Sequence, residues 1–255
     1  MNDTHTPCLL SPKAASHLLF VTIGIHAEAE FIDSYIPGGM SKAFKQWANP
    51  ASKTLSPHAL FMRLPILSPK ITVIDFAHHA FGEPCPYPIY IDDEDVIAQD
   101  VLIIDKGHTA NLMTNREMAT KLGIPPTGSA RIPNHGEPPE TFIRNIALLP
   151  YGDSVADMQA SIRDGFYLAD CKEAVGDPSG EFDCLITEGY RIRDGIICEP
   201  IKGCIAWGGG EEFLSSISMV GDDFKWFEKV LASRKLAPQG LGAPSIMANL
   251  FIGQY

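Results

Sequence analysis

One hairpin signal restricts the fold more than any other feature of this sequence. Apolar residues alternate with polar ones over residues 185–192 and 196–201, and Asp194-Gly195 lies in the turn between the two runs. An Asp-Gly pair readily adopts the left-handed backbone of the tight turns that join antiparallel strands. A second hairpin is expected where Lys106-Gly107 follows the β-branched run 100–104. Both signals favour antiparallel neighbours over a doubly wound parallel sheet.

Helices separate these hairpins and complete the predicted fold. Ser11-Pro12 fits the cap and first turn of a helix over residues 11–35, and Gly123 fits the left-handed end of a helix over 115–122. Hairpins interspersed with helices indicate an α+β fold with a mixed, largely antiparallel sheet. The other expected segments are an irregular excursion at 37–70, strands at 71–75, 144–149 and 245–252, and helices at 153–164, capped by Asp153, and at 211–218.

The composition is that of an ordinary globular protein. The chain has 255 residues, 45% of them hydrophobic, and a mean hydropathy of +0.02. This length can bury one large core, and no linker or internal repeat divides it, so we expect a single domain over residues 1–255. The net charge of −11 repels phosphate backbones, which counts against nucleic acid as a partner.

The N-terminal segment and the cysteines indicate a cytoplasmic location. The first ten residues lack the basic start and apolar run of a signal peptide. No stretch reaches the roughly 20 apolar residues of a membrane helix, so no membrane contact is expected. The six cysteines form no CxxC pair, which fits neither a zinc ribbon nor a disulfide scaffold. We expect a cytoplasmic protein with reduced thiols.

Two groups of polar residues have the residue types of a metal site. The four consecutive carboxylates at 92–95 could bind a hard cation, but their spacing is not that of a calcium loop, and a solvated loop is expected. His26 and Glu30 are four residues apart and would share one face of the first helix, while His78 and His79 follow a predicted strand. Two ligands do not complete a zinc site, so surface or hydrogen-bonded roles are the alternative for these side chains.

No other local signature indicates catalysis. The sequence has no GxSxG elbow, and the glycine cluster at 208–210 lacks the Lys-Ser/Thr of a phosphate-binding loop. The residues alone therefore predict an α+β domain without a recognisable catalytic centre.

A series of short segments nevertheless runs in a recognisable order from the first helix to the last strand. In that order they resemble the C-terminal domain of the TldD/PmbA family, which comprises zinc peptidases and their paralogous partners. No single segment is specific, but together they cover almost the whole chain. The segments are LSPKAA at 10–15, ITVID at 71–75, DDE at 92–94, VLIIDKG at 101–107, REMATKLG at 116–123, TGSAR at 127–131, GFYL at 165–168, DPSGEF at 177–182, EGYRIRDG at 188–195, PIKG at 200–203 and GLGAP at 240–244.

The departures from the family pattern concern its metal site. Catalytic members carry HExxxH on the first helix, and a later CGKxxQ segment supplies a cysteine ligand. The resemblance aligns the two zinc histidines with Phe20 and Ile25 and the glutamate with Val21, and residues 229–235 contain no cysteine. Phe, Val and Ile offer zinc no donor atom, and a metal-bound water would have no base beside it. The resemblance implies that this chain has no catalytic residue and no metal or other cofactor of its own.

The resemblance therefore implies a TldE-like pseudo-enzyme. Such a chain is expected to form a dimer with a TldD-like subunit whose intact HExxxH holds the zinc. The complex would degrade unfolded peptides or trim leader peptides from modified natural-product precursors. This chain would supply half of a chamber and strand edges for an extended peptide, at residues the sequence does not identify. The match begins near residue 11, so we expect the family's large N-terminal domain to be absent.

Two alternatives remain open. One is a self-sufficient metallohydrolase with relocated ligands, drawn from His26, Glu30, His78, His79 and His108. The other is a homodimeric scaffold that binds peptides and needs no second subunit. The first alternative predicts a stoichiometric metal ion in the purified chain, and the second predicts activity without a partner.

Overall fold

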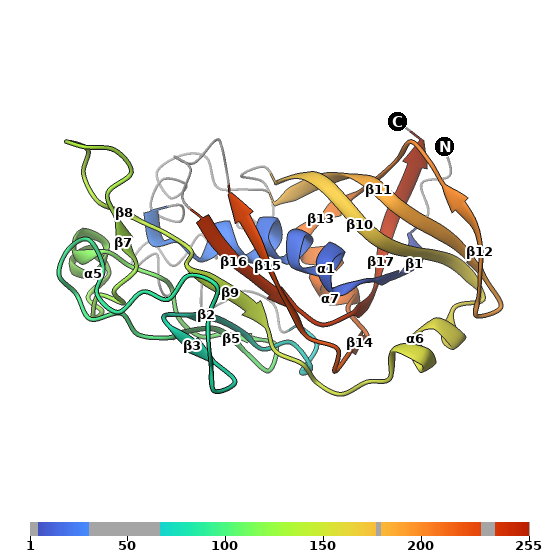
Figure 1. Cartoon of the computed structure of the whole chain (residues 1–255), viewed down its shortest axis with the longest axis horizontal. Helices are drawn as coiled ribbons and strands as arrows, with labels where there is room; N and C mark the ends of the chain where they lie inside the picture. The colour runs from blue at the N-terminus through green and yellow to red at the C-terminus, as the bar shows by residue number, and fades with distance from the viewer. Residues whose placement is uncertain (1–4, 31–66, 177–179, 231–237, 255) are drawn as a thin grey trace, which may run out of the picture.

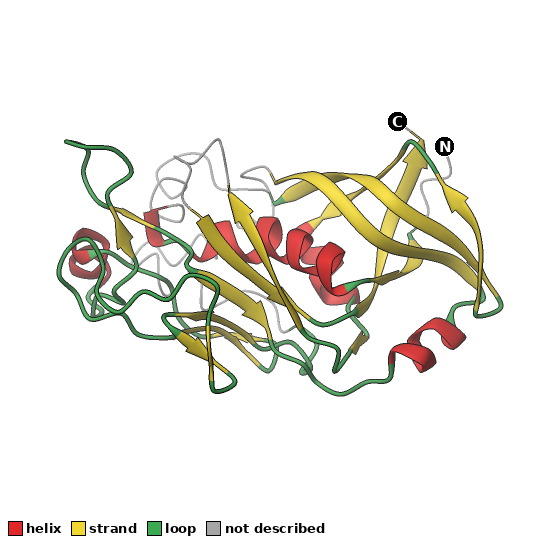
Figure 2. Cartoon of the chain, viewed as in Figure 1, coloured by secondary structure: helices red, strands yellow, loops and turns green. Residues whose placement is uncertain are grey.

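The computed structural model describes residues 5–30, 67–176, 180–230 and 238–254. Two sheets lie to either side of the first helix, which runs through the middle of the molecule (Figure 1). Strands make up most of the regular structure, and the helices are short (Figure 2).

The larger sheet contains a ring of five strands that closes on itself. β1 pairs in parallel with β10 and antiparallel with β17, while β11 and β13 connect β10 to β17 on the other side. Two further strands lie outside this ring, β12 on β11 and β14 on β17. The strands are β1 (Thr6–Leu10), β10 (Asp164–Gly176), β11 (Glu181–Arg193), β12 (Ile196–Ile201), β13 (Cys204–Gly209), β14 (Met219–Val220) and β17 (Ile246–Gln254).

The second sheet has six strands in the order β15-β16-β9-β2-β5-β6. Among the described strands, only β9 and β16 are parallel in this sheet, as β1 and β10 are in the other. The predicted α+β class with a largely antiparallel arrangement is therefore confirmed. Its strands, and those of two short ladders, are β2 (Val73–Phe76), β5 (Val101–Asp105), β6 (His108–Thr109), β9 (Asn145–Leu148), β15 (Lys225–Val230), β16 (Pro238–Ala243), β3 (His79–Ala80) with β4 (Glu83–Pro84), and β7 (Ala130–Arg131) with β8 (Glu140–Thr141).

The helices begin and end at the residues that favour their termini. Ser11 caps the first helix, where its hydroxyl oxygen accepts from the N–H of Ala14 at 3.2 Å. Asn115 caps α5, which ends at Gly123 with a left-handed φ of 69°. The helical segments are α1 (Pro12–Leu19), η1 (Phe20–Gly24), η2 (Ile25–Ala27), α5 (Arg116–Leu122), α6 (Val155–Ser161) and α7 (Gly210–Ser216).

The first helix joins the two sheets through the main apolar core. α1 contacts β10 of the ring and β9, β15 and β16 of the second sheet. Its buried side chains, Leu18 among them, belong to one apolar cluster that also includes Ile103 and Leu148 of the second sheet and Leu250 of the ring. This central position puts the residues that follow α1 at the junction of the two sheets.

Several expected elements differ from those observed. The helix expected at 153–164 is α6, and Ser154 caps it, because Asp153 instead pairs with Lys70 and accepts from the N–H of Val220. The helix expected over 11–35 has ended by Ala27, and 31–35 lies outside the described residues, as does most of the excursion expected at 37–70. The hairpin at Asp194-Gly195 is confirmed.

The structure also bears on the cysteines and on membrane-spanning helices. All six cysteines are free. Among the residues described, no helix is long and apolar enough to cross a membrane.

Candidate functional site

The first helix changes its hydrogen-bond pattern where the family resemblance places zinc-binding residues. Phe20–Gly24 forms a π-helical segment, in which the hydroxyl of Thr22 donates to the carbonyl four residues earlier at 2.8 Å. Ile25–Ala27 tightens into a 3-10 turn, and Glu28 then takes an extended ψ of 125°. π-helical turns are rare and are often found at functional sites. The backbone is therefore unusual at these positions.

The side chains at these positions are packed in hydrocarbon. Phe20 is 1% exposed and Val21 is 2% exposed, and both belong to the main core, against which the half-buried Ile25 also packs. Gly24 is tightly enclosed, since a Cβ there would lie 2.8 Å from Cδ1 of Ile143 and the Ile143 side chain would have to shift. None of these side chains carries a donor atom, and their burial excludes the water that a catalytic zinc would activate.

His26 and Glu30 do not share a helix face, so that prediction was wrong. The helix ends between them because Ala27 and Ala29 both hydrogen-bond to the backbone of Met113, at 3.0 and 3.1 Å. Glu30 Oε1 instead accepts from Asn115 Nδ2 at 2.7 Å and from the backbone N–H of Thr141 at 2.8 Å. Burial raises the pKa of the Glu30 carboxyl above its usual value. Glu30 thus connects the residues that follow the first helix to α5 and β8.

The other histidine candidates lie on the second sheet and on the β3–β4 ladder beside it. The Nδ1 atoms of His78 and His79 are 3.0 Å apart, and the His78 ring stacks on Tyr90 with centroids 5.0 Å apart. His108 is exposed in β6. Within the described ranges, no three His, Cys, Asp or Glu side chains are grouped so that they could hold a metal ion. The described residues therefore do not fit a zinc ion.

The acidic run at 92–95 is only partly the solvated loop that was expected. Asp92 is 6% exposed, and its carboxylate accepts from two N–H groups of its own turn and from the N–H of Ala130. Glu94 Oε2 accepts from the N–H of Arg116 in the first turn of α5, at 2.7 Å. The other two residues are exposed, and Asp93 Oδ2 accepts from the N–H of Ile132 at 2.7 Å. Three of the four carboxylates thus accept hydrogen bonds from backbone N–H groups, a role that the run of four acidic residues did not predict.

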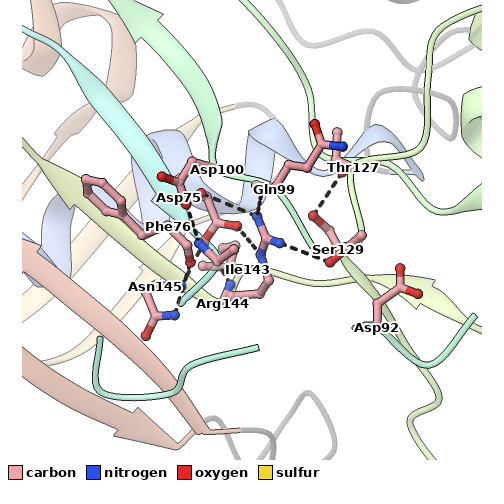
Figure 3. A network of polar contacts seen from close by, with 12 residues as sticks. Asp75, Phe76, Asp92, Gln99, Asp100, Thr127, Ser129, Ile143, Arg144 and Asn145 are labelled. Carbon is pink, nitrogen blue, oxygen red and sulfur yellow. Dashed lines mark hydrogen bonds and ion pairs between the residues drawn. The ribbon is translucent and has the colours of Figure 1, made fainter. Parts of the chain in front are cut away.

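A buried ion pair in the second sheet was not predicted. Asp75 and Arg144 face one another in this sheet (Figure 3). Asp75 is fully buried and Arg144 is 4% exposed. Arg144 Nε donates to Asp75 Oδ2 at 2.7 Å, and the guanidinium also donates to the carbonyls of Gly128 at 3.0 Å and Gln99 at 2.7 Å. A buried charge is tolerated when it is paired and its hydrogen bonds are satisfied, and both conditions hold here.

The same network fixes the start of β9. The backbone N–H groups of Arg144 and Asn145 both donate to Asp75 Oδ1 at 2.9 Å. The Asn145 amide donates to the carbonyl of Phe76 (Figure 3). It also donates to the carbonyl of Tyr87 and accepts from the N–H of Tyr87. With these partners engaged, the network serves to hold β2, β9 and the adjoining loops together. The only sequence signal is a charged residue at the end of each of two apolar strands.

The fold and the apolar packing at Phe20, Val21 and Ile25 define the chain as an α+β protein with no group of metal ligands among the described residues. It is similar in fold to TldE from Thermococcus kodakarensis, with a TM-score of 0.70 and 17% identity over 98% of this chain and 50% of that one. It is also similar to a proposed modulator of a DNA gyrase from Thermotoga maritima MSB8, with a TM-score of 0.72 and 20% identity over 99% of this chain and 50% of that one.

The sequence identifies the family. Residues 3–252 match the PmbA/TldA metallopeptidase C-terminal domain, and the chain belongs to this family. The zinc metalloprotease TldD homolog of Saccharolobus solfataricus is 32% identical over 145 residues, which are 57% of this chain and 33% of that protein. The metalloprotease TldD homolog of Buchnera aphidicola subsp. Acyrthosiphon pisum is 32% identical over 168 residues, 64% of this chain and 35% of that protein. The matched part of the chain thus spans about a third of these relatives.

Proposed function

We propose that this chain is a non-catalytic, TldE-like subunit of a heteromeric TldD/TldE-type zinc peptidase complex. The complex degrades peptides or trims them, as in the removal of a leader peptide from a modified natural product. The zinc and the HExxxH motif belong to a TldD-like partner subunit. Family membership supports the reaction class, and the observation that carries the non-catalytic role is the apolar packing of Phe20, Val21 and Ile25.

The burial of Phe20 and Val21 counts against a zinc site more strongly than the absence of a motif does. A catalytic zinc needs three protein ligands and an open position that water can reach. Phe20 and Val21 are almost completely buried, so these two positions offer neither donor atoms nor access for water. A single substitution would not rebuild the site, since the neighbouring positions would still be apolar.

Strand edges are what this subunit can offer to a peptide. Among the strands that the structure describes, β15 and β6 end the six-stranded sheet. An extended peptide can add to such an edge through main-chain hydrogen bonds, while pockets for alternate side chains provide selectivity. A non-catalytic subunit would in this way hold a peptide for cleavage at the zinc of its partner.

The first test is the zinc content of the chain purified alone, measured by elemental analysis beside a His26→Ala variant. Near-zero zinc in both proteins is the expected result. About one zinc ion per chain, lost in the variant, would overturn the proposal in favour of a metallohydrolase with relocated ligands.

The second test adds a TldD-like subunit with an intact HExxxH. We expect the two proteins to co-elute in size-exclusion chromatography and to cleave an unstructured fluorogenic peptide that neither cleaves alone. Replacing the glutamate of the partner's HExxxH should abolish this activity while the complex still forms. Peptide binding by a stable homodimer of this chain, with no effect of the added subunit, would instead indicate the scaffold alternative.

A further inference from the structure

Exposed apolar side chains gather on the loops that follow β2. Phe81, Tyr90, Ile91 and Ile97 are 57%, 58%, 60% and 71% exposed, and they are four of the nine strongly exposed large apolar residues among those described. Single exposed apolar residues are ordinary, but a group of them is typical of a binding surface. The acidic-aromatic surface is defined here by these four residues with Glu83 and Asp95.

This surface is formed by a segment without positive charge. Residues 71–105 contain eight carboxylates and no Lys or Arg. Glu83 and Asp95 are exposed within it. The neighbouring Arg116 is held by Glu94, to whose carbonyl its Nε donates at 3.1 Å. The acidic-aromatic surface therefore presents negative charge and hydrocarbon together.

Phe81, in the turn between β3 and β4, has a left-handed backbone that bulky residues rarely adopt. Three two-residue turns have a left-handed residue followed by glycine: Phe81-Gly82, Lys106-Gly107 and Asp194-Gly195, with first φ values of 54°, 46° and 47°. Asn, Asp and Gly are favoured at that first position, and a bulky residue with positive φ is strained. The Phe81 ring packs on Phe224, with centroids 4.9 Å apart, and still remains more than half exposed. Hairpin formation alone does not explain a phenylalanine here.

One ring contact connects the hairpin that carries Phe81 to the loop that carries Tyr90. The His79 ring, next but one to Phe81 in the hairpin, lies 6.4 Å from the Tyr90 ring, centroid to centroid. Ile91, which follows Tyr90, forms a β-bridge with Ile97. The turn at Phe81 and the 90–97 loop thus present their apolar groups on neighbouring parts of the molecule.

We propose that the acidic-aromatic surface binds a polypeptide segment in which Lys or Arg residues alternate with apolar residues. The cationic side chains pair with Glu83 and Asp95 and stack on the faces of Phe81 and Tyr90. The apolar side chains cover the exposed isoleucines. The complementary charge of the surface is the reason for this choice of occupant. The inference does not rest on the non-catalytic role, and its test needs neither zinc nor a second subunit.

The test is fluorescence anisotropy of the full chain with a labelled peptide that alternates lysine with leucine and tryptophan. Two control peptides carry glutamate in place of lysine or serine in place of the apolar residues. Each control should bind at least about tenfold more weakly. Equal affinity for the acidic peptide would overturn the proposal, because charge complementarity would then have no part in binding.

Two variants locate the binding on the surface without disturbing the backbone. Phe81→Asn puts a residue that favours left-handed backbone into the turn and should weaken peptide binding about tenfold or more. Asp95→Asn, at a φ of 58°, should weaken it about threefold and reduce its dependence on salt. Asp194→Asn is the matched control, with the same charge change at a φ of 47° in another hairpin, and should bind as wild type.

Wild-type affinity in both surface variants would overturn the proposal. The proposal would also be overturned if no cationic peptide binds and sedimentation shows that the chain self-associates through Phe81, with the association lost in Phe81→Asn. The surface would then bind a second copy of the chain. Thermal unfolding of each variant confirms that the fold is intact. None of these outcomes depends on the zinc content of the chain. The peptide-binding proposal can therefore fail while the non-catalytic role stands, and the reverse also holds.

Discussion

Two buried regions meet along one short segment of the second sheet and are built in opposite ways. Ile143 and Ile146 lie against Gly24 in the apolar region that contains Phe20. Between them, Arg144 and Asn145 contribute to the charged centre around the buried Asp75. The first region offers no donor atom, whereas the donors and acceptors of the second are engaged with one another.

The difference shows that neither region offers a metal ion an open set of ligands. A catalytic metal requires donors that point at one another across a space that water can enter. Phe20 fills the corresponding space with a ring, and Asp75 already accepts from the Arg144 side chain and from two backbone N–H groups. Both regions instead stabilise the junction of the helix and the sheet, one by packing and the other by hydrogen bonds.

The largest effect is expected when the charged centre loses its acceptor. Asp75→Ala should lower the free energy of unfolding by about 3–5 kcal/mol, because it leaves a buried guanidinium and two backbone N–H groups without their partner. Arg144→Ala should cost less, since Asp75 keeps both backbone donors. Urea unfolding measures both, with the exposed Asp105→Ala as a control within about 0.5 kcal/mol of wild type. Equal losses for Asp75→Ala and Arg144→Ala would contradict this account of the network.

A ligand-type residue in the apolar region should have the next largest effect. Phe20→His should destabilise the chain by about 2–4 kcal/mol, because it removes buried hydrocarbon and buries ring nitrogens among apolar neighbours. Phe20→Leu is the matched control and should cost less, since it keeps the position apolar. Added zinc should restore no stability to Phe20→His. A higher unfolding temperature of Phe20→His in the presence of zinc would mean that neighbouring side chains can bind the metal together with the new histidine.

The sequence predicted the features that depend on neighbouring residues. Asp194-Gly195 specifies its own turn, and Asn115 and Gly123 bound α5 by hydrogen bonds within a few residues. β10 was not predicted, because its strand conformation depends on pairing with β1 and β11, which lie far away in the sequence. The ion pair of Asp75 and Arg144, 69 residues apart, was missed for the same reason.

The candidate site shows the same limit. The apolar identities of Phe20 and Val21 are visible in the sequence once the order of the family segments is noticed. The helix period put His26 and Glu30 on one face, but the backbone of Met113 ends the helix between them. Contacts made by residues distant in the sequence decide where that helix stops.

A smaller effect tests how tightly the apolar region is filled. In Gly24→Ala the new methyl group would lie 2.8 Å from Cδ1 of Ile143. Overpacking of about 1–3 kcal/mol should exceed the roughly 1 kcal/mol gained from helix propensity, so a net loss of about 1 kcal/mol is expected in urea unfolding. Gly208→Ala is the control, since its methyl group would make an ordinary contact 3.7 Å from Phe182. A stability gain in Gly24→Ala would show that Ile143 moves aside freely.

The smallest expected effect concerns Glu30. Its buried carboxyl lies between the residues that follow the first helix and the start of α5. Burial raises its pKa, so the folded chain holds this proton more tightly than the unfolded chain. The unfolded state therefore binds fewer protons, and stability falls as the pH rises from the ordinary glutamate pKa through the raised value. Glu30→Gln stays neutral and escapes this loss.

The difference in unfolding free energy between Glu30→Gln and wild type should consequently shift in favour of the variant as the pH increases. Urea unfolding across the acidic to neutral range measures it, with the exposed Glu83→Gln as a control for the loss of a carboxylate as such. A shift in favour of wild type would mean that the hydrogen bonds from Asn115 and Thr141 outweigh burial. In that case Glu30 is held as a carboxylate, and its charge stabilises the end of the first helix.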